Sequence, residues 1–136
     1  AETLFQAGLR WDPEAAGMYN NLGSVYLRLG DVPEAGRTFE AGLQRDPDSF
    51  ELTLNLGIAC SAQGLFERGE KVLRQATTLR PEHAPAHYEL GRVFLAQGKD
   101  DLARMALERT LALDPAYPRR AEIESVLKRL AEGGGE

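Results

Sequence analysis

Three groups of side chains have the types and the spacing that catalysis or metal binding would use. Cys60 is the single cysteine of the chain, and a cysteine thiolate is a nucleophile. His83 and His87 are four residues apart, so on a helix their imidazole nitrogens would share one face, as in many zinc sites. Asp100 and Asp101 are adjacent carboxylates, which general acid–base catalysis could use. Each of these interpretations depends on the elements that position the residues.

A structural explanation is stronger for each group. Cys60 is predicted to occupy a buried helix position, where a thiol packs as a small apolar side chain. No third metal ligand is indicated beside the histidines, and His87 occupies a packing position. Asp100 can cap a helix that begins at Asp101, and carboxylates there favour the helix dipole. We therefore expect no catalytic residue, no metal and no cofactor, and predict that the chain is not an enzyme.

The elements behind these positions recur every 34 residues, without a slip. The recurring residues are Leu22, Leu56 and Leu90; Gly23, Gly57 and Gly91; Gly30, Gly64 and Gly98; and Pro47, Pro81 and Pro115. A fixed period of this size indicates stacked supersecondary units, so function is expected on the surface that the stack creates. The same regular spacing separates the glycines from a phosphate-binding loop, in which they would cluster before one helix.

Each unit is predicted to be two helices joined by a turn. Tyr19 and Gly23 lie at helical spacing on one face, and Phe39 lies on a second helix after the turn. A glycine within a helix costs about 1 kcal/mol relative to alanine, so its recurrence needs a packing reason. We expect that reason to be a close approach of small residues, as between Gly57 and Gly69.

These residues resemble the tetratricopeptide repeat. Its pattern of aromatic, Leu-Gly, aromatic, small, aromatic, small and proline positions is matched by Tyr19, Leu22-Gly23, Tyr26, Ala35, Phe39, Gly42 and Pro47. The second copy departs from the pattern at Thr53, Cys60 and Gly69, and the third mainly at His87 and Thr110. The resemblance implies an all-α fold, a right-handed α-solenoid (superhelix) of about eight helices in stacked antiparallel pairs.

The predicted organisation is a single domain over 1–132 followed by a flexible tail over 133–136. The domain divides into a half repeat (1–15), three repeats (16–49, 50–83 and 84–117) and a capping helix (118–132) with an apolar stripe of Ile123, Val126, Leu127 and Leu130. Helices are predicted over 1–10, 15–29, 33–45, 50–63, 66–79, 84–97, 101–113 and 118–132. Because the chain begins partway through a repeat, we expect it to be a piece of a longer protein.

Composition excludes several classes of partner. With 43% hydrophobic and 27% charged residues the chain is typical of water-soluble proteins. A net charge of −5, with lysines and arginines scattered singly, argues against nucleic acid or an anionic membrane as the partner. No apolar run is long enough to span a bilayer, no secretory signal is visible, and one cysteine excludes an internal disulfide. The compartment stays open, with the cytoplasm favoured.

The predicted binding surface is the concave side of the stack, formed by residues of each first helix that do not face the second helix. Its residues are Asn20, Asn21, Ser24, Leu27, Arg28, Leu54, Asn55, Ile58, Tyr88, Glu89, Arg92 and Leu95. The resemblance implies that this groove binds extended or helical peptides, with Asn21 and Asn55 holding the peptide backbone in a ladder that Glu89 interrupts. The alternative is that both asparagines are merely solvated polar residues.

Two functions follow from the resemblance. The first is a scaffold that binds a peptide or partner protein in the groove, and the alternative is a regulatory or assembly segment of a larger enzyme whose catalytic part lies outside this chain. The carboxylate clamp of chaperone-binding relatives is disfavoured, because its positions hold Asn20, Ser24, Asn55, Pro85 and Glu89 and only Asn55 fits. An apolar strip beside Arg28 and Arg92 instead suggests a peptide with apolar anchors and an acidic residue.

The amino-terminal half repeat predicts a second kind of contact. Phe5 and Leu9 would form the apolar face of a helix that lacks its first-helix partner. We expect this face to be covered by upstream repeats in a longer protein, and to cause weak self-association in the isolated chain.

Overall fold

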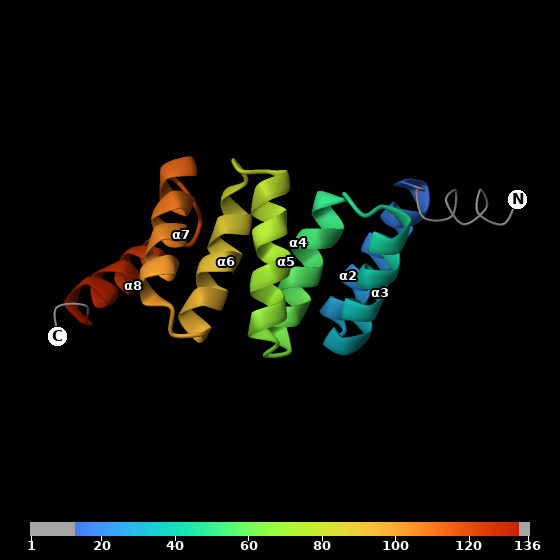
Figure 1. Ribbon diagram of the computed structural model, residues 1–136, viewed down its shortest axis with the longest axis horizontal. Helices are drawn as coiled ribbons and strands as arrows, with labels where there is room; N and C mark the ends of the chain where they lie inside the picture. The colour runs from blue at the N-terminus through green and yellow to red at the C-terminus, as the bar shows by residue number, and fades with distance from the viewer. Residues whose placement is uncertain (1–12, 134–136) are drawn as a thin grey trace, which may run out of the picture.

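The computed structural model describes residues 13–133, and within that range the chain forms helices and no strand. The helices are α2 (Pro13–Arg28), α3 (Val32–Arg45), α4 (Phe50–Ala62), α5 (Phe66–Leu79), α6 (Ala84–Ala96), α7 (Asp100–Leu113) and α8 (Arg120–Gly133). Figure 1 shows them side by side in a row, with α2 and α3 at one end and α8 at the other. The predicted all-α fold of stacked helix pairs is confirmed. The helix expected over 1–10 lies outside the described residues.

The turn inside each helix pair is closed by a glycine in the left-handed conformation. Gly30, Gly64 and Gly98 have φ values of 84°, 79° and 75°, which cost glycine little because it has no Cβ. The residue after each glycine donates its N–H to a carbonyl five residues earlier, as Asp31 does to Tyr26 O at 2.9 Å. This Schellman-type closure satisfies carbonyls at the end of the first helix and turns the chain into the second.

Side chains cap two of the helix starts. Asp31 accepts a hydrogen bond from the Glu34 N–H at 3.4 Å, and Ser49 accepts one from Leu52 N at 3.3 Å. The predicted cap at Asp100 is wrong, because α7 begins at Asp100 itself and no side chain of the described structure caps it. Asp100 and Asp101 both lie in the first turn of α7, where their charge still favours the helix dipole.

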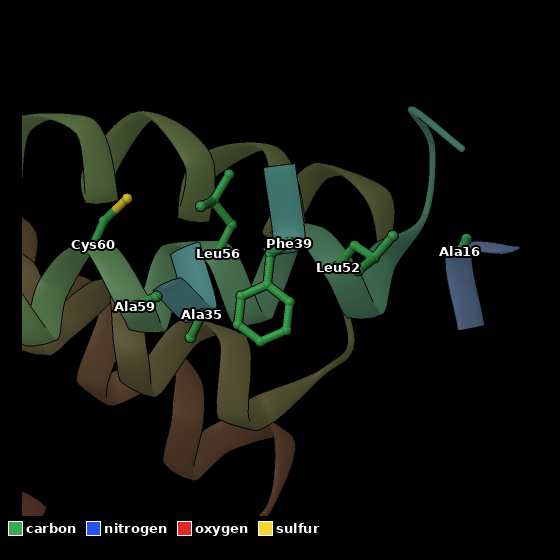
Figure 2. Close-up of a cluster of buried hydrophobic side chains, with 7 residues drawn as sticks. All are labelled: Ala16, Ala35, Phe39, Leu52, Leu56, Ala59 and Cys60. Atoms are coloured by element: carbon green, nitrogen blue, oxygen red, sulfur yellow. The ribbon is translucent and has the colours of Figure 1, made fainter. Parts of the chain in front are cut away.

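The glycine within each first helix receives a large side chain from the second helix. A Cβ on Gly23 would lie 2.4 Å from Cε1 of Phe39, which is fully buried. The expected close approach of Gly57 and Gly69 is not the reason for the glycine, since a Cβ on Gly69 would be in ordinary contact with Gly57 O at 3.6 Å. Figure 2 shows Phe39 in the cluster that joins α2, α3 and α4, whose other members are Ala16, Ala35, Leu52, Leu56, Ala59 and Cys60.

The first helices of successive pairs lie closer together than the second helices do. Helix α2 contacts α4, and α4 contacts α6, whereas in the described range α3 does not contact α5 and α5 does not contact α7. The row therefore curves with α2, α4 and α6 on its inner side, as in other solenoids. No helix of residues 13–133 is long and apolar enough to cross a membrane.

Helix α8 departs from the 34-residue period. It begins 36 residues after α6, whereas α6 begins 34 residues after α4. The shift brings Ile123 to the packing position that Thr53 has in α4, and Ile123 is buried against Tyr88 and Leu107. Leu127 then takes the position of Gly57. No second helix follows α8 within the described residues, so a bulky side chain is accommodated there.

Candidate functional site

A pair of amide side chains lies on the concave side between α2 and α4. Nδ2 of Asn55 donates a hydrogen bond to Oδ1 of Asn20 at 2.6 Å, and both residues are half-buried. The amide nitrogen of Asn20 and Oδ1 of Asn55 have no hydrogen-bond partner in the described structure. Because an amide donates and accepts, the bonded pair still offers two donors and one acceptor to a ligand.

The ladder between Asn21 and Asn55 that the period predicts is wrong in its register. Asn21 is exposed, and Asn55 bonds Asn20 instead. Successive first helices are offset, so that a residue meets its neighbour 35 positions later rather than 34. Near this pair, Oγ of Ser24 donates to the Asn20 carbonyl at 2.8 Å, which uses the hydroxyl proton within α2.

Apolar side chains occupy the middle of the groove. Leu54 and Leu95 are half-buried and pack against the cores on either side of α6, and Ile58 is half-buried on α4. Leu27 is also half-buried, against the cluster around Phe39, whereas Arg28 is exposed in the last turn of α2. These residues combine a structural contact with an exposed part that a ligand can reach.

Tyr88 is covered rather than open to the groove, which corrects its prediction as a ligand-binding residue. Its side chain is only 3% exposed. The ring of Tyr117 lies 5.4 Å away between centroids, and the Tyr88 hydroxyl donates to Glu122 Oε1 at 3.3 Å. The physical cause is the connection before α8, which carries Tyr117 over the aromatic ring.

Charged residues surround this covered tyrosine. The carboxylate of Glu89 is 17% exposed and lies 3.6 Å from Nη1 of Arg92. Burial raises the pKa of the Glu89 carboxyl, and the positive charges of Arg92 and Arg119 oppose that rise. The guanidinium carbons of Arg92 and Arg119 lie 5.8 Å and 5.6 Å from the centre of the Tyr88 ring, within the range of cation–π attraction. The two arginines are about half exposed, so a ligand can reach them.

Arg119, Tyr117 and Glu122 were not predicted from the sequence. All three follow Pro115, where the period changes, so a shift of 34 residues assigns them no equivalent position. The Tyr-Pro-Arg sequence after the last repeat is the only local signal, and it indicates a turn rather than a binding role.

The residues that first suggested catalysis are engaged in packing or in local hydrogen bonds. Cys60 is buried, and burial raises the pKa of its thiol. His83 contacts the Phe50 ring edge-on at 4.7 Å between centroids, and burial lowers its pKa. Nε2 of His87 lies 2.8 Å from Pro81 O. Among residues 13–133 no three metal-binding side chains come together.

Comparison with family models matches the chain to the tetratricopeptide repeat over residues 1–50 and 54–118. No curated protein matches its sequence significantly.

Many solved structures share the fold. The first TPR domain of Spaghetti (RPAP3), bound to the HSP90 peptide SRMEEVD, is 23% identical, with 95% of this chain and 100% of that chain covered and a TM-score of 0.86. The type III secretion chaperone SycD of Yersinia enterocolitica, in complex with a peptide of the translocator YopD, is 16% identical, with 87% and 93% covered and a TM-score of 0.80. O-GlcNAc transferase from Thermobaculum terrenum is 29% identical, with 87% of this chain but 22% of that chain covered and a TM-score of 0.78.

Proposed function

The chain belongs to the tetratricopeptide repeat family, and on that premise we propose that it is a protein-interaction scaffold that binds a peptide segment of a partner protein in its concave groove. The observation that carries the proposal is the hydrogen-bonded pair of Asn20 and Asn55. It puts unused amide donors and an acceptor on the inner side of the stack. Similar folds hold peptides in the RPAP3 and SycD structures, which supports the same use of the fold here.

The amide pair suits the backbone of an extended peptide. The free amide nitrogen of Asn20 can donate to a peptide carbonyl, and Oδ1 of Asn55 can accept from a peptide N–H. Because the two side chains already hold each other, less conformational entropy is lost when a peptide binds. The pair therefore recognises backbone without demanding a particular peptide side chain.

Peptide selectivity would come from the rest of the groove. Leu54, Ile58 and Leu95 provide apolar contact area for peptide anchors. Arg92 and Arg119 provide exposed positive charge, which Glu89 offsets only in part. We infer a ligand with apolar anchors and at least one acidic side chain. Nucleic acid is not proposed as a partner, because the chain carries a net charge of −5.

A regulatory or assembly role within a larger enzyme is the second candidate. It is favoured by the similarity to an O-GlcNAc transferase, of which the matched part is 22% of the chain. In both candidates these 136 residues act by binding and have no catalytic role of their own. A catalytic domain in the same open reading frame would favour the second candidate.

The test is selection of peptides from a random display library on the intact chain, followed by affinity measurement for the selected peptides. Asn20→Ala combined with Asn55→Ala is expected to weaken binding about tenfold, since a hydrogen bond contributes about 1 kcal/mol and the pair makes at least two. Asn21→Ala is the matched control, because Asn21 is exposed beside the pair and should leave affinity unchanged. Circular dichroism checks that each variant is folded. Full affinity of the folded double variant for every selected peptide would overturn the proposal.

A further inference from the structure

Helix α2 carries an apolar stripe on one face, made of Met18, Leu22 and Val25 and continued by Leu29 directly after the helix. These residues are spaced as one side of a helix, and Met18 and Leu29 are 70% and 74% exposed. A hollow of about 450 Å³ adjoins Met18 and Leu22. Single exposed apolar residues are common, but a continuous stripe along a whole helix marks a contact surface.

The positions that form this stripe are buried in the following first helices. One period later they are Leu52, Leu56 and Ala59 in α4, and two periods later Ala86, Leu90 and Val93 in α6. None of these six residues is more than 7% exposed. The face exposed on α2 is therefore a face that the fold elsewhere covers with a helix.

The element that covers this face in α4 is the second helix of the preceding pair. Gly42 of α3 lies against Leu52, where a Cβ on the glycine would be 2.9 Å from Leu52 Cδ1. Near the start of α3, a Cβ on Gly36 would be 3.3 Å from Nε2 of Gln63. Helix α3 thus runs antiparallel to α4, and it approaches most closely where it carries glycine. On α6, Ala76 of α5 meets Ala86 in the same way.

A segment of this chain has the matching pattern one period earlier. Gly8 corresponds to Gly42, Phe5 to Phe39 and Leu9 to Leu43, and the match to the family model begins at residue 1. We propose that residues 1–11 form a helix that covers the stripe on α2 as α3 covers α4, with Gly8 against Met18. Glu2, which corresponds to Gly36, then lies beside Leu29. The contact is independent of the peptide groove.

Disulfide cross-linking tests the register of this contact. In a Cys60→Ala background, Gly8→Cys with Met18→Cys is expected to form a disulfide within one chain. The control is Gly8→Cys with Leu29→Cys, because Leu29 is 11 residues further along and about 16 Å away on a helix, too far for a disulfide. A cross-link between two chains would show that a second copy covers the stripe and would overturn the proposal, as would the absence of any cross-link.

Hydrogen exchange provides a second measurement without new cysteines. Phe5→Asp places a charge at the position of the buried Phe39, and it should make α2 amides exchange about tenfold faster. Thr3→Asp adds the same charge at the position of Arg37, which is exposed, so exchange should not change. Equal exchange in both variants would contradict the proposed helix. Sedimentation at several concentrations tests the predicted self-association through the same face, and a dimer that Phe5→Asp dissolves would also overturn it.

Discussion

The side chain of Leu73 on α5 fills the space that a side chain on Gly57 of α4 would need. A Cβ on Gly57 would lie 2.5 Å from both Cγ and Cδ2 of Leu73, far inside van der Waals contact. Leu73 is fully buried, so it has no free space into which to move. The glycine is therefore required by the leucine rather than by the backbone of its own helix.

Gly57→Ala should accordingly lower the free energy of unfolding by about 1–3 kcal/mol, because overpacking outweighs the better helix propensity of alanine. Gly17→Ala is the matched control within a first helix. Gly17 is exposed and no atom of the described chain lies within 4 Å of the added methyl group, so alanine should stabilise by about 0.5–1 kcal/mol. Urea unfolding of both variants measures the difference. Shifts of the same sign would refute the packing role of Gly57.

Glu70 is predicted to stabilise the fold above acidic pH. Its side chain, 16% exposed, accepts hydrogen bonds from Lys99 at 2.7 Å and Arg74 at 2.9 Å, which lower the pKa of its carboxyl. A lowered folded-state pKa contributes stability that is present above the ordinary value of about 4.3 and is lost as pH falls through the folded value.

The substitution Glu70→Gln should therefore cost about 0.5 kcal/mol at pH 7, after screening by solvent, and nothing near pH 2. Glu67→Gln on the same helix is the control, since Glu67 is exposed. Thermal melts across this pH range compare the two variants, and a pH-independent cost at Glu70 would contradict the assignment.

Glu89 should show the opposite pH dependence. Burial raises the pKa of its carboxyl, so the folded state prefers the protonated form. The resulting destabilisation is absent below the unfolded pKa of about 4.3 and develops as pH rises towards the folded value. Glu89→Gln should thus raise the melting temperature at pH 7 and leave it nearly unchanged at pH 3. A loss of stability at pH 7 would mean that the pair with Arg92 outweighs burial.

The thiol of Cys60 should be unreactive in the folded chain. It is buried, and burial raises its pKa, so little reactive thiolate forms at neutral pH. Modification by a thiol reagent at pH 7.5 is expected only as fast as the chain unfolds, and it should speed up with added urea. Rapid, complete modification of the native chain would contradict this burial.

The helix pattern could be predicted from the sequence because the 34-residue period repeats every apolar position. Helix α5 was predicted over 66–79, as found, and α2 was predicted two residues late at its start. A period shows which residues share a face, but not how far one helix slides along the next. For that reason Gly69 was chosen over Leu73 as the partner of Gly57.

The candidate site was predictable only in part, for the same reason. The inner position of Asn55 follows from helical phase, but its bond to Asn20 depends on the offset between α2 and α4. The cover over Tyr88 depends on two additional residues before α8, which no extrapolation of the repeat contains. Whether the inner residues bind a peptide is a property of a partner, and it stays a prediction.

The three turn glycines have a stereochemical consequence. Their φ values of 84°, 79° and 75° are those that a mirror-image amino acid adopts as readily as an ordinary one adopts the right-handed helix. In a chain made by chemical synthesis, D-alanine at Gly98 would keep the turn while restricting the unfolded chain, a gain of about 0.5–1 kcal/mol. L-alanine at the same place would cost about 1–2 kcal/mol. At one residue in every 34, this fold is built for the opposite hand.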